Sequence, residues 1–356
     1  LTSTRGKARR MPVTLRNLLI SIYAFTYFLV LSFGLTVVGW VMFTLGKKTS
    51  RKKAAYHRML YSVARFTMHH FPQVRTTVEN TCGEDFRRPS IILCNHQSHL
   101  DLMCLLMLTP KLIILTNDWV WHSPFYGQLI RYADFYPVTE GLDRTLEHLR
   151  EAKHQGYSIA IFPEGTRSPD CSLLRFRRGA FFLAEQLNMD LLPVVLHGTG
   201  HVLPKQDFML RRGSIHVRVL PRITPADTRF GTDHIARARQ LRQFYRAEYE
   251  ALCRRVETPA YFSDLVLHNY IYKGPSVERA VRHALRQHDN YTAEISALPD
   301  NGEVALRNTG YGEQALLAAL VKPHLRITAV EPDDDRRAIA EHCAARPANL
   351  QYVSEA

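Results

Sequence analysis

The fold of this chain is decided by a stretch that runs from Ile91 to Asp101 and reads IILCNHQSHLD. Four apolar residues indicate a short buried strand, and the polar residues that follow open a helix. The same alternation continues from about Val74 to Pro221. Strands are predicted at Ile91–Cys94, Leu112–Leu115, Ser158–Phe162, Leu191–Leu196 and Ile215–Leu220, and helices at Ser98–Leu108, Leu142–Gln155, Arg178–Asn188 and Asp233–Val256. This order predicts an α/β domain with a mixed, largely buried sheet flanked by helices.

His96 and Asp101 are candidates for acid–base chemistry. A carboxylate five residues after an imidazole can orient the ring and support it as a base. On one continuous helix the pair would point about 140° apart, so we expect His96 in the loop and Asp101 in the first turns of the helix. The alternative interpretation is structural: Asn95 or Ser98 caps the helix, and His96 is an ordinary loop residue.

A second polar stretch, Phe162–Ser168, reads FPEGTRS and follows the predicted strand Ser158–Phe162. Proline makes the turn rigid, glycine permits close backbone approach, and the arginine can fork onto a phosphate. The alternative is a plain turn with a surface arginine. Seven specific residues in this order favour a functional loop.

Charge and apolar residues are concentrated at the start of the chain. The net charge of the 356 residues is +13, yet residues 1–78 hold thirteen Lys/Arg and no acid. Asn17–Gly46 carries no charge and is long enough to cross a bilayer. Both flanks are basic, so orientation cannot be inferred, and the segment either spans once or turns back near Ser32–Gly34 or Gly39. The flanking residues are Arg5, Lys7, Arg9, Arg10 and Arg16 before the segment, and Lys47, Lys48, Arg51, Lys52 and Lys53 after it.

The next stretch, Ala54–Phe71, predicts a basic amphipathic helix on anionic headgroups. A core helix with a solvated basic face is the alternative. A nucleic-acid partner is not expected, because no recognised nucleic-acid motif accompanies the charge. The six cysteines form no CxxC pair, which excludes a disulfide scaffold and a cysteine-built zinc site; no metal is expected.

Together these motifs resemble the phospholipid/glycerol acyltransferase family, the lysophosphatidic acid acyltransferases. The family's blocks are matched by Asn95, His96 and Asp101, by Phe162–Ser168, by Leu192–Val195, and by the basic stretch Arg175–Ala180. The second block departs: Phe135–Glu140 lacks the usual arginine, and the nearest one, Arg144, is displaced. The resemblance covers roughly Arg16 to Val256.

The resemblance implies transfer of a fatty acyl group from acyl-CoA or acyl carrier protein to a 1-acylglycerol-3-phosphate-like lipid in phospholipid biosynthesis. It implies a bacterial inner membrane, an active site facing the cytoplasm, and no cofactor for acyl transfer. His96 would be the base and Asp101 its orienting group. The implied substrate-binding residues are Asn95, Glu164 for glycerol hydroxyls, Gly165, Thr166, Arg167 for the phosphate, and Arg177 or Arg178 beside it. An acyl-enzyme formed on Ser98 or Cys94 stays an alternative.

The C-terminal part follows another pattern. A predicted strand from Glu303 leads to Gly310-x-Gly312, a helix, and a strand ending in Glu331. This order is typical of a Rossmann unit, and it resembles motif I of class I S-adenosylmethionine methyltransferases, with Glu331 as the ribose acid. Asn308 and Gln314 depart from that motif, so a degenerate or truncated unit without activity is the favoured alternative.

The expected organisation has three parts: residues 1–73 (linker, membrane segment and interfacial helix), 74–257 (acyltransferase domain) and 258–356 (linker and partial methyltransferase-like unit). It resembles bacterial fusions of a lipid exporter, an acyltransferase and a methyltransferase, of which this chain, starting at Leu1, would be a fragment. The second functional hypothesis is a lipid-modifying methyltransferase fusion in which the acyltransferase-like domain only binds lipid.

Overall fold

The computed structural model describes residues 14–45, 47, 49–123, 127–137, 141–205, 209–344 and 346–355. Several expectations fall outside these residues, namely those for Arg5, Lys7, Arg9, Arg10, Gly46, Lys48 and residues 138–140. The chain forms two compact units that divide between Tyr249 and Glu250. This differs from the expected three parts, because the N-terminal helices belong to the same unit as the large sheet.

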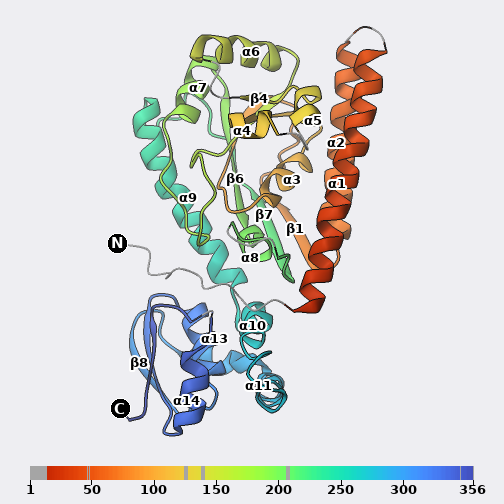
Figure 1. Ribbon diagram of the computed structural model, residues 1–356. Coiled ribbons are helices and arrows are strands. Elements are labelled where there is room, and N and C mark those ends of the chain that lie inside the picture. Colours follow the sequence, from red (N-terminus) through yellow and green to blue (C-terminus); the bar gives the residue numbers. More distant parts are fainter. Residues whose placement is uncertain are drawn as a thin grey trace. The chain divides into compact units, whose positions relative to one another are not determined.

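A seven-stranded sheet forms the centre of the larger unit, with strand order β1-β7-β6-β2-β5-β3-β4 (Figure 1). All neighbouring strands are parallel except β6 and β7, so the predicted mixed sheet is confirmed. The strands are β1 (Val74–Asn80), β2 (Ser90–Cys94), β3 (Leu112–Thr116), β4 (Tyr136–Pro137), β5 (Ser158–Ile161), β6 (Asp190–His197) and β7 (Gly213–Val219).

Strand β1 was not predicted, although the five predicted strands all form within two residues of their expected ends. It is an edge strand whose only buried residue is Val74, and the polar residues after it give no continuous apolar run. Strand β2, in contrast, is buried at all five positions. Sequence periodicity therefore finds the strands with several buried positions, such as β2 and β7, and misses the solvated edge.

Helices cover both faces of this sheet (Figure 1). They are α3 (Leu100–Leu106), α4 (Asp118–Trp121), α5 (Gly127–Tyr132), α6 (Leu142–His154), α7 (Gly179–Leu187), α8 (Thr199–Val202) and α9 (His234–Val256). Tyr245 anchors α9 over the central strands: its buried hydroxyl donates to the Leu93 carbonyl and accepts from the Val194 amide. This contact fixes α9 directly behind the end of β2, where the first polar motif begins.

The N-terminal helices α1 (Leu15–Thr44) and α2 (Ser50–His70) lie side by side along the larger unit (Figure 1). Helix α1 is continuous, so the turn considered near Ser32–Gly34 or Gly39 is not formed. It is also the one described helix that is long and apolar enough to cross a membrane. Its contacts extend over most of its length, from Ser21, whose Oγ accepts the Leu210 amide, to Met42, whose carbonyl accepts Lys52 Nζ.

The second unit contains a three-stranded parallel sheet with strand order β10-β9-β8. Its elements are α10 (Pro259–His268), α11 (Pro275–Gln287), η1 (Asp289–Tyr291), α12 (Thr292–Ala297), β8 (Gly302–Arg307), α13 (Glu313–Val321), β9 (Leu325–Val330), α14 (Asp334–Glu341) and β10 (Leu350–Val353). The predicted strand–glycine loop–helix–strand order is confirmed as a partial Rossmann-like unit, with Gly310 and Gly312 between β8 and α13.

Candidate active site

His96 lies in the loop between β2 and α3, and Asp101 lies in the first turn of α3. His96 Nδ1 is 2.7 Å from Asp101 Oδ2, and the same oxygen accepts the backbone amides of Gln97 and Ser98 at 2.6 and 2.8 Å. Because Oδ2 accepts these amides, it also accepts from Nδ1, so in the neutral imidazole Nδ1 carries the proton and Nε2 keeps its lone pair. The loop-then-helix placement expected from the spacing is therefore present, with His96 ready to accept a proton at Nε2.

The neighbours of His96 hold the ring in one orientation. The imidazole stacks on Phe162, with ring centroids 4.0 Å apart and planes 17° apart. Asn95 clamps the loop to β6, because its side chain donates to the Leu196 carbonyl and accepts the Leu196 amide at 2.8 and 2.7 Å. Asn95 is buried and is not among the residues that line the adjacent cavity. It therefore supports the loop from behind.

Glu164 connects the two motif loops. It is buried, Oε1 accepts the His96 amide, and Oε2 accepts the Leu174 amide, both at 3.0 Å. Burial raises the pKa of this carboxyl to about 7, although the two amides act in the opposite direction. The resemblance implied that Glu164 binds glycerol hydroxyls. In the structure both of its carboxylate oxygens instead accept hydrogen bonds from backbone amides.

Gly165 and the arginines lie around the same site. Gly165 has φ 69°, and a Cβ added there would lie 2.8 Å from Arg177 Nε. Glycine is therefore suited to this position, because it adopts the left-handed backbone conformation and leaves room for the guanidinium. Arg167 and Arg177 line the cavity. Thr166 and Arg178 do not: Thr166 Oγ1 accepts Lys205 Nζ, and Arg178 is exposed at the N-terminus of α7.

A cavity of about 1100 Å³ opens beside His96. Loops after β2 and β5 contribute the polar part of its wall, and mostly apolar side chains of α1, α2, α3 and β3 form much of the rest. No aspartate or glutamate lines it among the described residues, whereas Arg167, Arg177 and Lys205 do. The cavity therefore suits an amphiphile with an anionic group.

Neither alternative nucleophile is placed for attack. The Ser98 hydroxyl is buried and donates to the Leu203 carbonyl at 2.7 Å. Cys94 is fully buried, burial raises the pKa of its thiol, and Sγ donates to its neighbour's carbonyl, that of Asn95. An acyl-enzyme on either residue would need a side chain that is accessible from the cavity, so these contacts favour direct transfer.

The divergent second block contributes only apolar surface in its described part. Phe135 is buried and lines the cavity, and Tyr136 and Pro137 form β4. Arg144, the displaced arginine, is exposed on α6 and does not line the cavity. Lys205, in contrast, lies on the cavity wall and was not predicted. No motif surrounds it, and its partners Thr166 and Arg167 are almost forty residues away.

The C-terminal glycine loop contacts side chains of its own unit where S-adenosylmethionine was expected. Glu331 is buried, and its Oε2 accepts the Gly310 amide at 2.6 Å. A Cβ added at Gly312 would lie 2.6 Å from the Tyr352 hydroxyl, so this glycine accommodates the protein's own tyrosine. The carboxylate expected to bind the ribose is thus bonded to the backbone of its own loop. We therefore assign no reaction step to this group.

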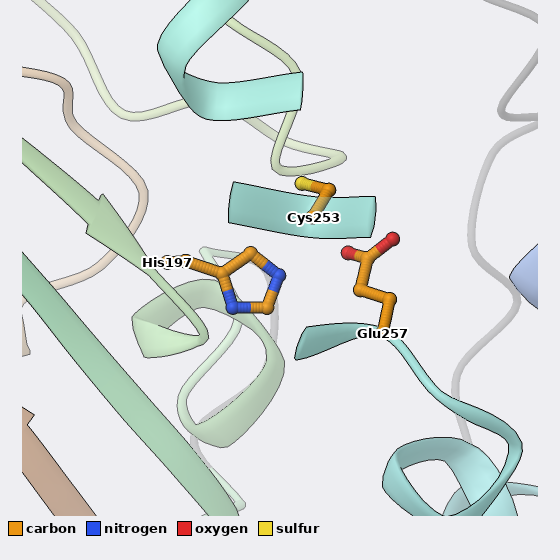
Figure 2. A group of neighbouring side chains, drawn as sticks. All are labelled: His197, Cys253 and Glu257. Carbon is orange, nitrogen blue, oxygen red and sulfur yellow. The ribbon is translucent and has the colours of Figure 1, made fainter. Parts of the chain in front are cut away.

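Figure 2 draws three side chains of metal-ligating types, His197, Cys253 and Glu257. His197 ends β6 in the larger unit, whereas Cys253, in α9, and Glu257, directly after it, belong to the other unit. Because no single unit contains all three, they do not form a metal site of either unit.

The two polar motifs thus meet on loops at the carboxyl ends of β2 and β5. Residues 66–197 match the family model Acyltransferase. This segment contains both motifs, so the family model supports the sequence-based resemblance over these residues.

Two curated relatives and one solved structure illustrate this similarity. The chain is 31% identical over 145 residues to 1-acyl-sn-glycerol-3-phosphate acyltransferase LPAT1, chloroplastic, of Arabidopsis thaliana, covering 39% of this chain and 40% of the relative. It is 30% identical over 146 residues to the 1-acyl-sn-glycerol-3-phosphate acyltransferase of Saccharomyces cerevisiae, covering 39% and 48%. The chain thus spans less than half the length of these relatives.

Among solved structures, the crystal structure of the 1-acyl-sn-glycerophosphate (LPA) acyltransferase PlsC from Thermotoga maritima matches with a TM-score of 0.53. The match has 23% identity and covers 67% of this chain and 95% of that chain. At this identity the likeness establishes the fold, and the predicted acyltransferase fold is confirmed.

Proposed function

We propose that the chain transfers a fatty acyl group from an acyl thioester to a hydroxyl of a 1-acylglycerol-3-phosphate-like lipid. The observation that carries this proposal is the His96–Asp101 pair beside a large, mostly apolar cavity, where the charged lining residues in the described part of the chain are cations. The named activity of the relatives supports it.

The reaction follows from the state of His96. Nε2 removes the proton of the acceptor hydroxyl, the oxygen attacks the thioester carbonyl, and an ester bond forms as the C–S bond breaks. The imidazolium then returns its proton to the departing thiolate. Asp101 stabilises the transient positive charge through the 2.7 Å bond to Nδ1. The proton taken from the hydroxyl thus ends on the thiol that leaves, and the reaction needs no cofactor.

The acceptor proposal rests on the cavity wall. Arg167 can form two parallel hydrogen bonds with a phosphate, and Arg177 adds a second cation next to Gly165. The apolar walls of α1 and α2 suit acyl chains. Acyl-CoA and acyl carrier protein both remain candidate donors, because both deliver a thioester.

Attachment to a lipid surface is part of the same proposal. Large apolar side chains of α1, among them Leu19, Phe33 and Trp40, are more than half exposed, while its buried residues are Ser21, Ser32 and Gly39. A helix of a water-soluble domain buries its large apolar residues instead. Small residues toward protein and large ones outward are typical of lipid-facing helices. We therefore place the outer face of α1 in a membrane, with the bacterial inner membrane and a cytoplasmic active site as the sequence-based expectation.

The methyltransferase fusion hypothesis is separated from this proposal by one assay. Purified protein is incubated with lysophosphatidic acid and a radiolabelled acyl group, which is bound either to CoA or to acyl carrier protein. The reaction is run with and without S-adenosylmethionine. We expect labelled phosphatidic acid in both cases. Product that appears only with S-adenosylmethionine, or methylated lipid without acyl transfer, would support the second hypothesis.

His96→Ala tests the catalytic assignment in the same assay. Loss of a general base typically lowers turnover about 10²- to 10⁴-fold. His154→Ala, an exposed histidine at the end of α6, is the matched control and should retain wild-type turnover. Near wild-type turnover of His96→Ala, with the control also active, would remove His96 from the mechanism.

A further inference from the structure

Helix α9 carries three side chains that reach the two motif loops, namely Arg242, Tyr245 and Tyr249. They are three and four residues apart in sequence, and this spacing puts side chains on the same face of a helix. All three belong to the larger unit. Among the described residues that line the cavity, none comes from α9. This face of α9 therefore contacts the loops from behind and does not reach the cavity.

Two tyrosine hydroxyls of this face meet the chain on either side of His96. The Tyr245 hydroxyl donates to the carbonyl of Leu93, near the end of β2, at 2.6 Å. The Tyr249 hydroxyl accepts Gln97 Nε2 at 2.8 Å. Both tyrosines and Gln97 are buried. Because Leu93 lies just before His96 and Gln97 directly follows it, α9 holds the chain on both sides of the imidazole.

The third side chain connects α9 to the second motif loop. Arg242 Nε donates to the Leu174 carbonyl at 3.0 Å. The amide of Leu174 donates to one oxygen of Glu164, and the other oxygen accepts the His96 amide. These bonds form a continuous path from α9 through the Glu164 carboxylate to the backbone of His96. One helix face thus contacts both of the segments that form the candidate active site.

We propose that Tyr245 and Tyr249 are positioning residues for acyl transfer, which fix the backbone around His96 so that Nε2 stays aimed at the acceptor hydroxyl. The inference rests on the proposed function and deepens it. Neither side chain lines the cavity, so each acts through the imidazole. Displacement of a catalytic group by about 1 Å can cost about 10²-fold in rate, because proton transfer needs a short and aligned contact.

A general contribution to stability is the competing explanation, because loss of any buried hydrogen bond destabilises a fold. The chain offers a matched control in Tyr270. This residue is also buried, and its hydroxyl donates to the Tyr311 carbonyl at 2.8 Å. Both residues belong to the second unit. Tyr270→Phe therefore removes the same kind of bond without touching either motif loop.

The test measures kcat and both KM values with acyl-CoA and lysophosphatidic acid, well below the melting temperature of each protein. The proteins compared are the wild type, Tyr245→Phe, Tyr249→Phe and Tyr270→Phe. We expect kcat to fall about 10- to 100-fold in Tyr245→Phe and in Tyr249→Phe. Both KM values should stay near those of the wild type, because the cavity wall is unchanged. Tyr270→Phe should keep the wild-type kcat.

A double-mutant cycle with His96→Ala separates a role through the imidazole from a role elsewhere. If Tyr245 acts through His96, Tyr245→Phe should not lower the residual turnover of His96→Ala any further. A further loss as large as that in the wild-type background would overturn the inference. An unchanged kcat in the folded single variants would do the same, as would a raised KM without a change in kcat.

Amide hydrogen exchange on the wild type covers the case in which the variants fail to fold or His96→Ala has no measurable turnover. Residues 95–98 form a loop, yet we expect their amides to exchange about as slowly as those of β2. Exchange as fast as in the largely exposed loop of residues 81–87 would show that α9 does not hold the motif loop. Absence of transfer by the wild type to any acceptor would count against the proposed function, whereas the exchange result tests the hold of α9 independently.

Discussion

Asp101 collects three N–H donors on a single carboxylate oxygen, one from the imidazole and two from the backbone of its own loop. This arrangement sets the tautomer of His96 and the shape of the loop at once. An asparagine at this position keeps the size of the side chain, but its amide N–H can donate a hydrogen bond to Nδ1. The imidazole proton would then move to Nε2, where the base is needed.

We therefore expect Asp101→Asn to lower kcat about 10²- to 10⁴-fold, in the range for loss of a general base. The KM for lysophosphatidic acid should change far less, because Asp101 is fully buried and does not line the cavity. Steady-state kinetics with both substrates varied measures the two quantities. A raised KM with unchanged kcat would mean that Asp101 shapes only the binding site.

Glu164 gives the molecule a pH dependence with a definite sign. Its folded-state pKa of about 7 lies above the usual value of 4.5, so the folded protein binds this proton more tightly than the unfolded chain does. The stability associated with the group is fully present below about pH 4.5 and is lost as the pH rises through 7. Between these limits the loss is on the order of 3 kcal/mol.

Glu164→Gln should remove this contribution. The free energy of unfolding of the wild type, relative to that of the variant, should fall between pH 5 and pH 8. Denaturant titrations of both proteins in the same detergent measure it. A constant difference between the two proteins across this range would show that Glu164 stays ionised throughout.

At the level of single elements, the two N-terminal helices have different tasks. Several basic residues of the α1–α2 region are engaged in the fold. Lys52 Nζ donates to the carbonyl of Met42 in α1 and to that of Leu45 directly after it, and Lys53 forms an ion pair with Asp134 at 2.6 Å. Arg58 is exposed on α2 and is therefore better placed to meet anionic headgroups. The outer face of α1 supplies the apolar part of the proposed lipid contact.

A charge on that outer face tests the proposed lipid contact. Phe33 is 71% exposed, so Phe33→Asp should leave the fold intact. A carboxylate in the apolar part of a bilayer costs about 3 kcal/mol, so more of the variant should be released from vesicles by a high-salt wash. Ile235→Asp, at a 48% exposed position on α9, is the control and should stay with the vesicles. Equal retention of both variants would place the outer face of α1 outside the membrane.

At the scale of the whole molecule, the sequence by itself determined most of the architecture, although not the edge strand β1 or the division into two units. The buried strands of the large sheet are short apolar runs between polar loops, and such runs need no tertiary information to be seen. The same holds for the uncharged stretch that becomes α1 and for the strand–glycine–helix–strand order of the second unit. His96 and Asp101 were also found, because their contact spans only five residues along the chain.

Only the tertiary structure decided which side chains meet at the site. The sequence resemblance implied substrate binding by four further residues, namely Asn95, Glu164, Thr166 and Arg178. In the fold the first three form hydrogen bonds with protein groups, and Arg178 is exposed and does not line the cavity. Lys205 lines the cavity although the sequence analysis did not predict it. These differences share one physical reason: the direction of a side chain at a loop is set by hydrogen bonds to segments far away in sequence, here from ten to about one hundred residues distant. Local patterns determine where a loop occurs, and the packing of strands and helices around it determines which of its residues face the cavity.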